Sequence, residues 1–295
     1  MNTITVIGAG TMGNGIAHAF AAHSFGVRLV DVRSEALEAA RTTIARNLDR
    51  QIKKELIDEA EKAATLDRIA THTELQEAVD GAALVVEAAT ENLAVKQQLF
   101  ETLSTLCAPD TVLATNTSSI SITKIAAATA RPEQVIGMHF MNPVPVMPLV
   151  EIINGYRTRP AVTEQIVRTV EQLSKTPLVV NDYPGFVANR ILMPMINEAI
   201  IALHEGVAEV TAIDQIMQLG MAHPMGPLRL ADFIGLDVCL SIMRVLHEGL
   251  GSDKYAPCPL LVNMVEAGVL GVKSGEGFYN YADGPKSQKV AERFR

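Results

Sequence analysis

The feature that most constrains this chain is a glycine-rich turn between an apolar strand and an apolar helix. The turn reads Gly8-Ala9-Gly10-Thr11-Met12-Gly13, follows a predicted strand over Ile4–Ile7 and opens a predicted helix over Gly15–Ala22. In such a turn the first glycine permits the tight bend. The second lets the backbone approach a pyrophosphate, and the third lets the helix pack against the strand. The helix N-terminus adds unpaired N–H groups and a positive dipole end. Residues 8–13 are therefore predicted to bind a dinucleotide.

The next strand indicates which dinucleotide. Val27–Val30 is apolar and ends in Asp31. A carboxylate at this point can accept hydrogen bonds from both ribose hydroxyls of NAD and would repel the 2′-phosphate of NADP. NAD is therefore the predicted cofactor. Arg33 leaves some use of NADP open, because an arginine there can accommodate the extra phosphate.

The first part of the chain alternates short β-rich runs with longer amphipathic stretches. This alternation is typical of parallel βαβ units, so we predict an α/β fold with a Rossmann-type, doubly wound, mostly parallel sheet over residues 1–183. An antiparallel pair is possible near the sheet edge, where the runs follow one another closely. Predicted helices include Ala36–Leu56 and Leu93–Leu106, and the later predicted strands are Leu84–Val86, Val112–Ala114, Val135–Met138, Leu149–Ile153 and Leu178–Val180.

The composition of the chain and the spacing of its apolar residues change near residue 183. From Phe186 the chain is rich in Met, Leu and Ile at helical spacing, and Pro184-Gly185 is a plausible helix start. We predict an all-α C-terminal domain over residues 184–295 that serves substrate binding and dimerisation. Its Met-rich stripe is core or subunit interface, and the polar residues 284–295 are expected to be a loosely held end.

Composition excludes several functional classes. The formal net charge is −8, so general binding to nucleic acid is not expected. There is no apolar run long enough to span a membrane, and no leader peptide precedes the first strand. The three cysteines, Cys107, Cys239 and Cys258, show no metal-binding or disulfide spacing. We expect a cytoplasmic protein with no metal.

Polar groups follow the apolar strands at points that line the ligand crevice of such a sheet. The strand Val135–Met138 runs into His139, and Val112–Ala114 runs into Thr115-Asn116-Thr117-Ser118. Glu151 lies inside the strand Leu149–Ile153, where a buried carboxylate needs a partner, and His139 would be that partner.

This pair suits the oxidation of an alcohol. A histidine can take the hydroxyl proton while hydride leaves, and a carboxylate on its other nitrogen fixes the tautomer. Ser118 could hydrogen-bond the reacting oxygen. Asn189, early in an apolar helix, either reaches into an interdomain cleft or makes a structural hydrogen bond at the helix start.

Together these motifs resemble the L-3-hydroxyacyl-CoA dehydrogenase family, of the short bacterial 3-hydroxybutyryl-CoA dehydrogenase kind. The resemblance covers nearly the whole chain. It rests on GAGTMGNGIA from Gly8, VVEAATENLAVK ending at Lys96, TNTSS from Thr115, GMHFMNPVPVMPLVE from Gly137, PGFVANRIL from Pro184, AHPMGPLRLADFIGLD from Ala222 and KSGEGFYNY from Lys273.

The resemblance implies specific roles for residues. His139 would be the general base, Glu151 its orienting carboxylate, and Ser118 and Asn189 would bind the substrate oxygens. The residues that would contact NAD are Gly8, Ala9, Gly10, Thr11, Met12, Gly13, Asp31, Glu91, Lys96, Asn116, Ser118, Asn142 and Lys273. Asn47 and Lys54 match the family's contacts to coenzyme A, although serine is the commoner residue at Asn47.

A basic stripe also favours a CoA ester. Arg46, Arg50 and Lys54 are spaced at i, i+4 and i+8 on the predicted helix, with Lys53 beside them. Such a stripe would attract phosphates, although nearby acidic residues also allow an ordinary solvated face. Pro148 stands where many family members carry lysine, which leaves the substrate preference open.

The sequence thus predicts NAD-dependent, reversible oxidation of a short-chain L-3-hydroxyacyl-CoA to the 3-oxoacyl-CoA by a homodimer. An alternative is a related dehydrogenase of a non-CoA 3-hydroxy acid, such as a sugar acid or carnitine. A further alternative is a non-catalytic NAD-binding protein.

Overall fold

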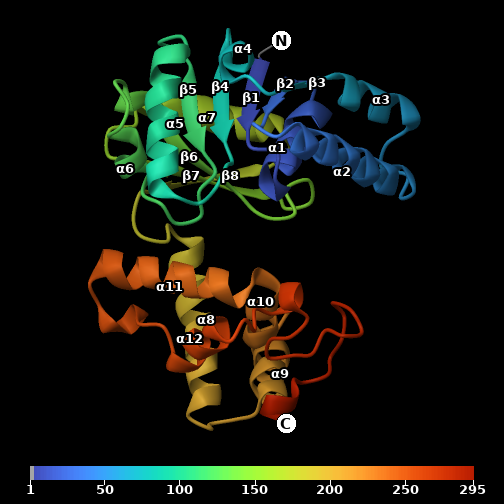
Figure 1. The fold of residues 1–295 in the computed structure, drawn as a ribbon, viewed down its shortest axis with the longest axis vertical. Helices are drawn as coiled ribbons and strands as arrows, with labels where there is room; N and C mark the ends of the chain where they lie inside the picture. Colours follow the sequence, from blue (N-terminus) through green and yellow to red (C-terminus); the bar gives the residue numbers. More distant parts are fainter. Residues whose placement is uncertain (1–2) are drawn as a thin grey trace. The chain divides into compact units, whose positions relative to one another are not determined.

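The structure is a computed structural model that describes residues 3–295. The chain forms two compact units (Figure 1), of which the first ends at Tyr183 and the second begins at Pro184. The first unit contains a sheet of eight strands, and the second is built mainly from helices.

The sheet of the first unit has the strand order β3-β2-β1-β4-β5-β6-β7-β8. All neighbouring strands run parallel except β6 and β7. The predicted doubly wound, mostly parallel sheet with an antiparallel pair toward one edge is thereby confirmed. The strands are β1 Thr3–Ile7, β2 Gly26–Val30, β3 Ile69–His72, β4 Leu84–Glu87, β5 Val112–Thr115, β6 Val135–Phe140, β7 Leu149–Asn154 and β8 Thr176–Asn181.

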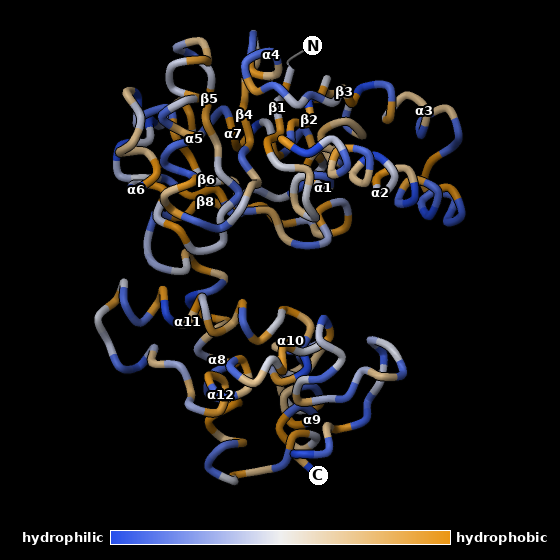
Figure 2. The backbone as a smooth tube through the Cα atoms, in the orientation of Figure 1, coloured by the Kyte–Doolittle hydropathy of each residue, from blue (hydrophilic) through white to orange (hydrophobic). Residues whose placement is uncertain are grey.

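Helices pack on both faces of this sheet, which explains why the central strands are apolar at consecutive positions. Val86 of β4 belongs to the core cluster that α1, α2 and α7 share with the sheet, while its neighbour Val85 is equally buried outside that cluster. Figure 2 shows the resulting hydrophobic strands. The helices are α1 Thr11–Ala22, α2 Ser34–Ile52, α3 Glu59–Asp67, α4 Leu75–Val79, α5 Leu93–Leu106, α6 Ile122–Ala126 and α7 Pro160–Gln172.

The region after β2 differs from the prediction. Helix α2 ends at Ile52 rather than at Leu56, and Glu55 adopts a left-handed conformation with φ 57°. The polar turn that follows is visible as a blue loop at the end of α2 in Figure 2. Helix α3 was not predicted, although Asp58 and Glu61 form a capping box at its start. The prediction also missed β3, a short edge strand of the sheet.

The second unit is a helical bundle, as predicted. Its core is formed by apolar side chains of all five helices and by three aromatic residues of the last segment, Phe278, Tyr279 and Tyr281. The helices are α8 Ala188–His204, α9 Val210–Met221, α10 Pro227–Ile234, α11 Leu236–Leu250 and α12 Pro259–Glu266. Over residues 3–295, no helix combines the length and the apolar character needed to cross a membrane.

The end of the chain is better anchored than predicted. Val290 forms a β-bridge with Tyr279, and the side chain of Ala291 is fully buried. The ring of Phe294 packs 5.6 Å from that of Phe278. The expectation of a loosely held end is therefore wrong for this part, because three apolar residues among the polar ones attach it to the bundle.

Candidate active site

The glycine turn between β1 and α1 has no room for side chains where the backbone closes on itself. Gly8 has φ 97°, and a Cβ atom on Gly13 would lie 1.7 Å from the Gly8 carbonyl oxygen. At Gly10 the space is open, with nothing within 4 Å of a Cβ. The first N–H groups of a helix have no intrahelical acceptor, and α1, which begins at Thr11, has no side-chain cap that accepts from them. This arrangement fits the phosphates of a dinucleotide.

Asp31 braces the same turn. Its Oδ2 atom accepts a hydrogen bond from the N–H of Ala9 at 2.9 Å, and its Oδ1 atom accepts one from the N–H of Arg33 at 3.0 Å. The Arg33 guanidinium lies 3.7 Å from the same carboxylate and is largely exposed. The carboxylate therefore stands at the end of β2 beside the glycine turn, and its contact with a ribose stays a prediction.

His139 and Glu151 meet across the antiparallel pair β6–β7. The two residues are paired in register, and the His139 Nδ1 and Glu151 Oε2 atoms are 2.8 Å apart. Both side chains are buried. Because a carboxylate only accepts hydrogen bonds, Nδ1 carries the proton in this contact, and Nε2 is the basic nitrogen of the neutral ring. The predicted contact is thus present in the structure.

Asn116 connects the end of β5 to the end of β6. Its Oδ1 atom accepts a hydrogen bond from the backbone N–H of Phe140 at 2.9 Å. Its backbone N–H donates to the carbonyl oxygen of Glu87 at 2.7 Å. The Asn116 side chain is buried. It therefore fixes the strand end that carries His139, one residue before Phe140.

A buried ion pair lies between β4 and α5. The Lys96 ammonium is 2.7 Å from both carboxylate oxygens of Glu87, and neither side chain is exposed. Thr115 Oγ1 and the N–H of Ala89 also donate to Glu87, at 2.6 and 2.7 Å. Sequence reasoning missed Glu87 because it follows three apolar residues of β4. A carboxylate in so apolar a strand was the available signal.

Glu91 links this ion pair to the loop after β5. It lies 3.6 Å from the Lys96 ammonium and accepts hydrogen bonds from Thr117 Oγ1 at 2.6 Å and from the N–H of Ser118 at 3.0 Å. Glu91 and Lys96 therefore hold the Ser118 backbone in place. Direct contacts of these two side chains with a cofactor stay predictions.

The basic stripe of α2 is only partly helical. Arg46 and Arg50 lie on the helix, whereas Lys53 caps it and Lys54 lies in the turn beyond Ile52. The predicted spacing of three basic residues along one helix is therefore wrong for Lys54. Asn47 accepts a hydrogen bond from Arg50 at 3.2 Å.

Two of the predicted site residues belong to the second unit. Asn189 lies in the first turn of α8 and is 8% exposed. Lys273 forms an ion pair with Asp237 of α11, within the same unit.

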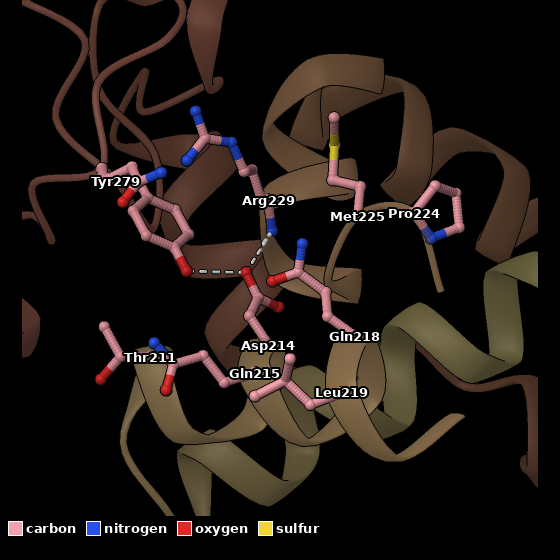
Figure 3. Close-up of a pocket in the computed structure, with 10 residues that line it drawn as sticks. Thr211, Asp214, Gln215, Gln218, Leu219, Pro224, Met225, Arg229 and Tyr279 are labelled. Carbon is pink, nitrogen blue, oxygen red and sulfur yellow. Dashed lines mark hydrogen bonds between the residues drawn. The ribbon is translucent and has the colours of Figure 1, made fainter. Parts of the chain in front are cut away.

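The second unit also contains a cavity of about 440 Å³, lined in part by Asp214, Gln218 and Arg229 (Figure 3). Asp214 accepts hydrogen bonds from Tyr279 Oη at 2.7 Å and from two backbone N–H groups at the start of α10. Burial raises the pKa of Asp214. Because these donors satisfy both oxygens, we interpret Asp214 as a structural residue that joins α9, α10 and the last segment.

Two family sequence models match the chain. One is described as "3-hydroxyacyl-CoA dehydrogenase, NAD binding domain" and covers residues 3–183, and the other as "3-hydroxyacyl-CoA dehydrogenase, C-terminal domain" and covers residues 185–281. The chain belongs to the 3-hydroxyacyl-CoA dehydrogenase family. The resemblance inferred from the motifs is confirmed, and NAD is the cofactor of the matched domain.

Individual members of the 3-hydroxyacyl-CoA dehydrogenase family are similar to this chain along nearly its whole length. A protein of Bacillus subtilis described as a probable 3-hydroxybutyryl-CoA dehydrogenase is 54% identical over 95% of this chain and 97% of its own. The 3-hydroxybutyryl-CoA dehydrogenase of Bradyrhizobium diazoefficiens is 54% identical over 94% of each chain. The crystal structure of (S)-3-hydroxybutyryl-CoA dehydrogenase from Ralstonia eutropha superposes with a TM-score of 0.93 at 47% identity, covering 96% of this chain and 99% of that one.

Proposed function

We propose that this 3-hydroxyacyl-CoA dehydrogenase reversibly oxidises short-chain L-3-hydroxyacyl-CoA esters, such as 3-hydroxybutyryl-CoA, to 3-oxoacyl-CoA with NAD. The observation that carries the proposal is the buried hydrogen bond between His139 and Glu151. It places an oriented imidazole at the end of β6, in the sheet whose β1 leads into the glycine turn. The names of the relatives support the substrate class.

The proposed chemistry needs one proton and one hydride to leave the substrate. NAD, when bound, supplies the hydride acceptor. His139 Nε2 takes the proton of the 3-hydroxyl group, and Glu151 stabilises the imidazolium that forms. Ser118 and Asn189 donate hydrogen bonds to the substrate oxygens and stabilise the charge that develops there.

The cofactor contacts follow from the glycine turn and the strand ends. The N–H groups at residues 8–13 bind the pyrophosphate, and Asp31 accepts the ribose hydroxyls, which favours NAD over NADP. Its hydrogen bonds to Ala9 and Arg33 leave further lone pairs of the carboxylate for this purpose. The remaining contacts that we propose come from Glu91, Lys96, Asn116, Ser118, Asn142 and Lys273.

The coenzyme A part of the substrate is assigned to the end of α2. Arg50, Lys53 and Lys54 are exposed there, and Asn47 lies on the same helix. Of the acidic neighbours, Asp49 is already paired with Lys62, which supports a locally positive surface for phosphates. Pro148 cannot provide the positive charge that many relatives have at this position.

We also propose a homodimer formed through the second unit. Several apolar side chains of α8 and α9 are exposed, including Ile191 at 68%, Leu219 at 85% and Met221 at 60%, and exposed apolar groups of this kind mark interaction surfaces. A cytoplasmic location is supported by the three cysteines, which are free and buried.

The test is NADH oxidation with acetoacetyl-CoA, run beside NADPH and beside free acetoacetate. Turnover with NADH and the CoA ester alone is expected. Turnover of free acetoacetate at a similar rate would instead favour a dehydrogenase of non-CoA hydroxy acids. NADH binding without turnover of either substrate would favour a non-catalytic protein. A series of acyl lengths then measures the chain-length preference.

The role of Glu151 is tested by Glu151→Gln. This change keeps the size of the side chain but removes its charge, so kcat should fall steeply while NADH still binds. An unchanged kcat would remove Glu151 from the proposed mechanism.

A further inference from the structure

A lysine outside all the motifs above holds the loop that joins the two catalytic strands. This loop, residues 141–148, connects β6 to β7. The Lys175 ammonium, from the turn between α7 and β8, donates to the carbonyl oxygens of Val144 at 2.6 Å and Met147 at 2.7 Å. The neighbouring N–H of Thr176 donates to the Pro148 carbonyl at 2.7 Å.

The loop is fixed on its other side by α1. The Val144 side chain is buried, and a Cβ atom added to Gly15 of α1 would lie only 2.9 Å from it. Within the loop, the N–H groups of Val146 and Met147 both donate to the Pro143 carbonyl. The loop is therefore a compact turn between α1 and the Lys175 ammonium.

The surroundings of Lys175 indicate that its ammonium is dedicated to these carbonyls. Over residues 3–295, no carboxylate lies within ion-pair distance of it. The titratable group that interacts with this ammonium is His18 of α1. His18 is fully buried, and its burial, with smaller effects of His23 and Lys175, lowers its pKa to about 4. Near neutral pH the ammonium therefore faces an uncharged His18.

The loop and the strands beside it are held by different contacts. Strand β7 is paired with β8 from Leu149 and with β6 from Val150, so the His139–Glu151 register is set by the sheet. Asn142 lies in the loop itself, two residues before Val144, outside that ladder. Removal of the Lys175 ammonium would thus release Asn142 while the catalytic pair stays in place.

We propose that Lys175 is a positioning residue that holds the 141–148 loop so that Asn142 contacts the nicotinamide cofactor. The proposal rests on the cofactor role assigned to Asn142 in the proposed function. It assigns to Lys175 an effect on cofactor affinity rather than on the chemical step. The two carbonyl contacts require a donor with more than one N–H, which arginine can replace and methionine cannot.

The experiment measures the Kd for NADH by nicotinamide fluorescence, together with KM for NAD and kcat, in Lys175→Met and Lys175→Arg. We expect Lys175→Met to weaken NADH binding about tenfold, which corresponds to roughly one hydrogen bond from a charged donor. KM for NAD should rise in parallel, with a smaller change in kcat and an unchanged pH profile. Lys175→Arg should restore most of the affinity.

The matched control is Arg131→Met. Arg131 also donates to backbone carbonyls, those of Leu103, Cys107 and Ala108, but it does so at the C-terminal end of α5. Arg131→Met should lower the melting temperature without changing the Kd for NADH. Equal loss of affinity in both methionine variants, or an unchanged Kd in Lys175→Met, would overturn the proposal.

A double-mutant cycle covers the case in which Lys175→Met does not fold. Lys175→Gln, which keeps an N–H donor, is combined with Asn142→Ala. If Lys175 acts through Asn142, Lys175→Gln should change the Kd less than about twofold once Asn142 is gone. Full additivity would overturn the proposal. Because NADH binding needs no turnover, failure of the proposed CoA-ester activity would be seen separately.

Discussion

Replacement of Lys96 by methionine should destabilise the first unit strongly. In the native protein the ammonium lies 2.7 Å from both oxygens of Glu87, and both side chains are fully buried. After Lys96→Met the carboxylate keeps its hydrogen bonds from Thr115 and Ala89. It has lost the only cation that contacts it among the ion pairs of residues 3–295.

The magnitude follows from that geometry. Removal of one partner from a buried ion pair destabilises a protein by about 3–5 kcal/mol, because an uncompensated charge remains. For a unit of this size, each kcal/mol lowers the melting temperature by about 2–4 °C. We therefore expect a decrease of roughly 6–20 °C. In Glu87→Gln/Lys96→Met neither of the two fully buried charges remains, and more than half of this loss should be recovered.

The assay is thermal unfolding followed by far-UV circular dichroism, since the chain contains no tryptophan. The transition of the first unit is identified in the wild type by its upward shift with NADH, which stabilises the unit that binds it. A single variant that melts within about 2 °C of the wild type would refute the reasoning. A double variant that melts as low as the single one would show that packing, rather than charge, is responsible.

Three further outcomes are expected. His139→Gln should lower kcat by about 10²–10⁴ while the Kd for NADH, measured by fluorescence, stays nearly constant; loss of NADH binding as well would indicate a structural role. Lys54→Glu should raise KM for acetoacetyl-CoA more at low salt than at high salt; a salt-independent effect would mean that Lys54 does not contact phosphate. Asp232 is a buried residue of α10 in the second unit, and burial raises its pKa to about 6, so protonation of Asp232 stabilises the folded state. This stabilisation is complete at pH values below the pKa of the unfolded chain, near 3.8, and is lost as the pH rises through the folded-state pKa of about 6. Urea unfolding of the second unit should therefore show wild type losing roughly 2 kcal/mol relative to Asp232→Asn between pH 4 and 7; parallel pH profiles would contradict this.

Sequence patterns predicted the parts of the site that depend on short-range geometry. The glycines at 8, 10 and 13 are demanded by the backbone of one turn, so their spacing was informative. His139 and Glu151 could be paired because each interrupts or ends an apolar strand, where a polar group needs a partner. Their register across β6 and β7 required the structure.

Contacts between distant segments could not be predicted in this way. Lys175 holds carbonyl oxygens some thirty residues away, and a carbonyl acceptor has no side-chain signature. Helix α2 ends at Ile52, and the turn that follows contains Glu55 in a left-handed conformation that a glutamate rarely adopts. The capping box of Asp58 and Glu61 was readable, and recognising it would have divided the predicted helix from α3.

The two hydrogen bonds of Asp31 bear on attempts to change the cofactor of this enzyme. A carboxylate at the end of β2 would repel a 2′-phosphate, so a change toward NADP would replace Asp31 by a neutral residue. Here the same carboxylate also accepts hydrogen bonds from the backbone N–H groups of Ala9 and Arg33. A substitution at position 31 would therefore loosen the glycine turn of residues 8–13 while it removes the proposed acceptor of the ribose hydroxyls. An NADP-accepting variant would need a new acceptor for the Ala9 N–H, and Asp31→Asn, which retains one side-chain oxygen, is a better starting point than Asp31→Ala.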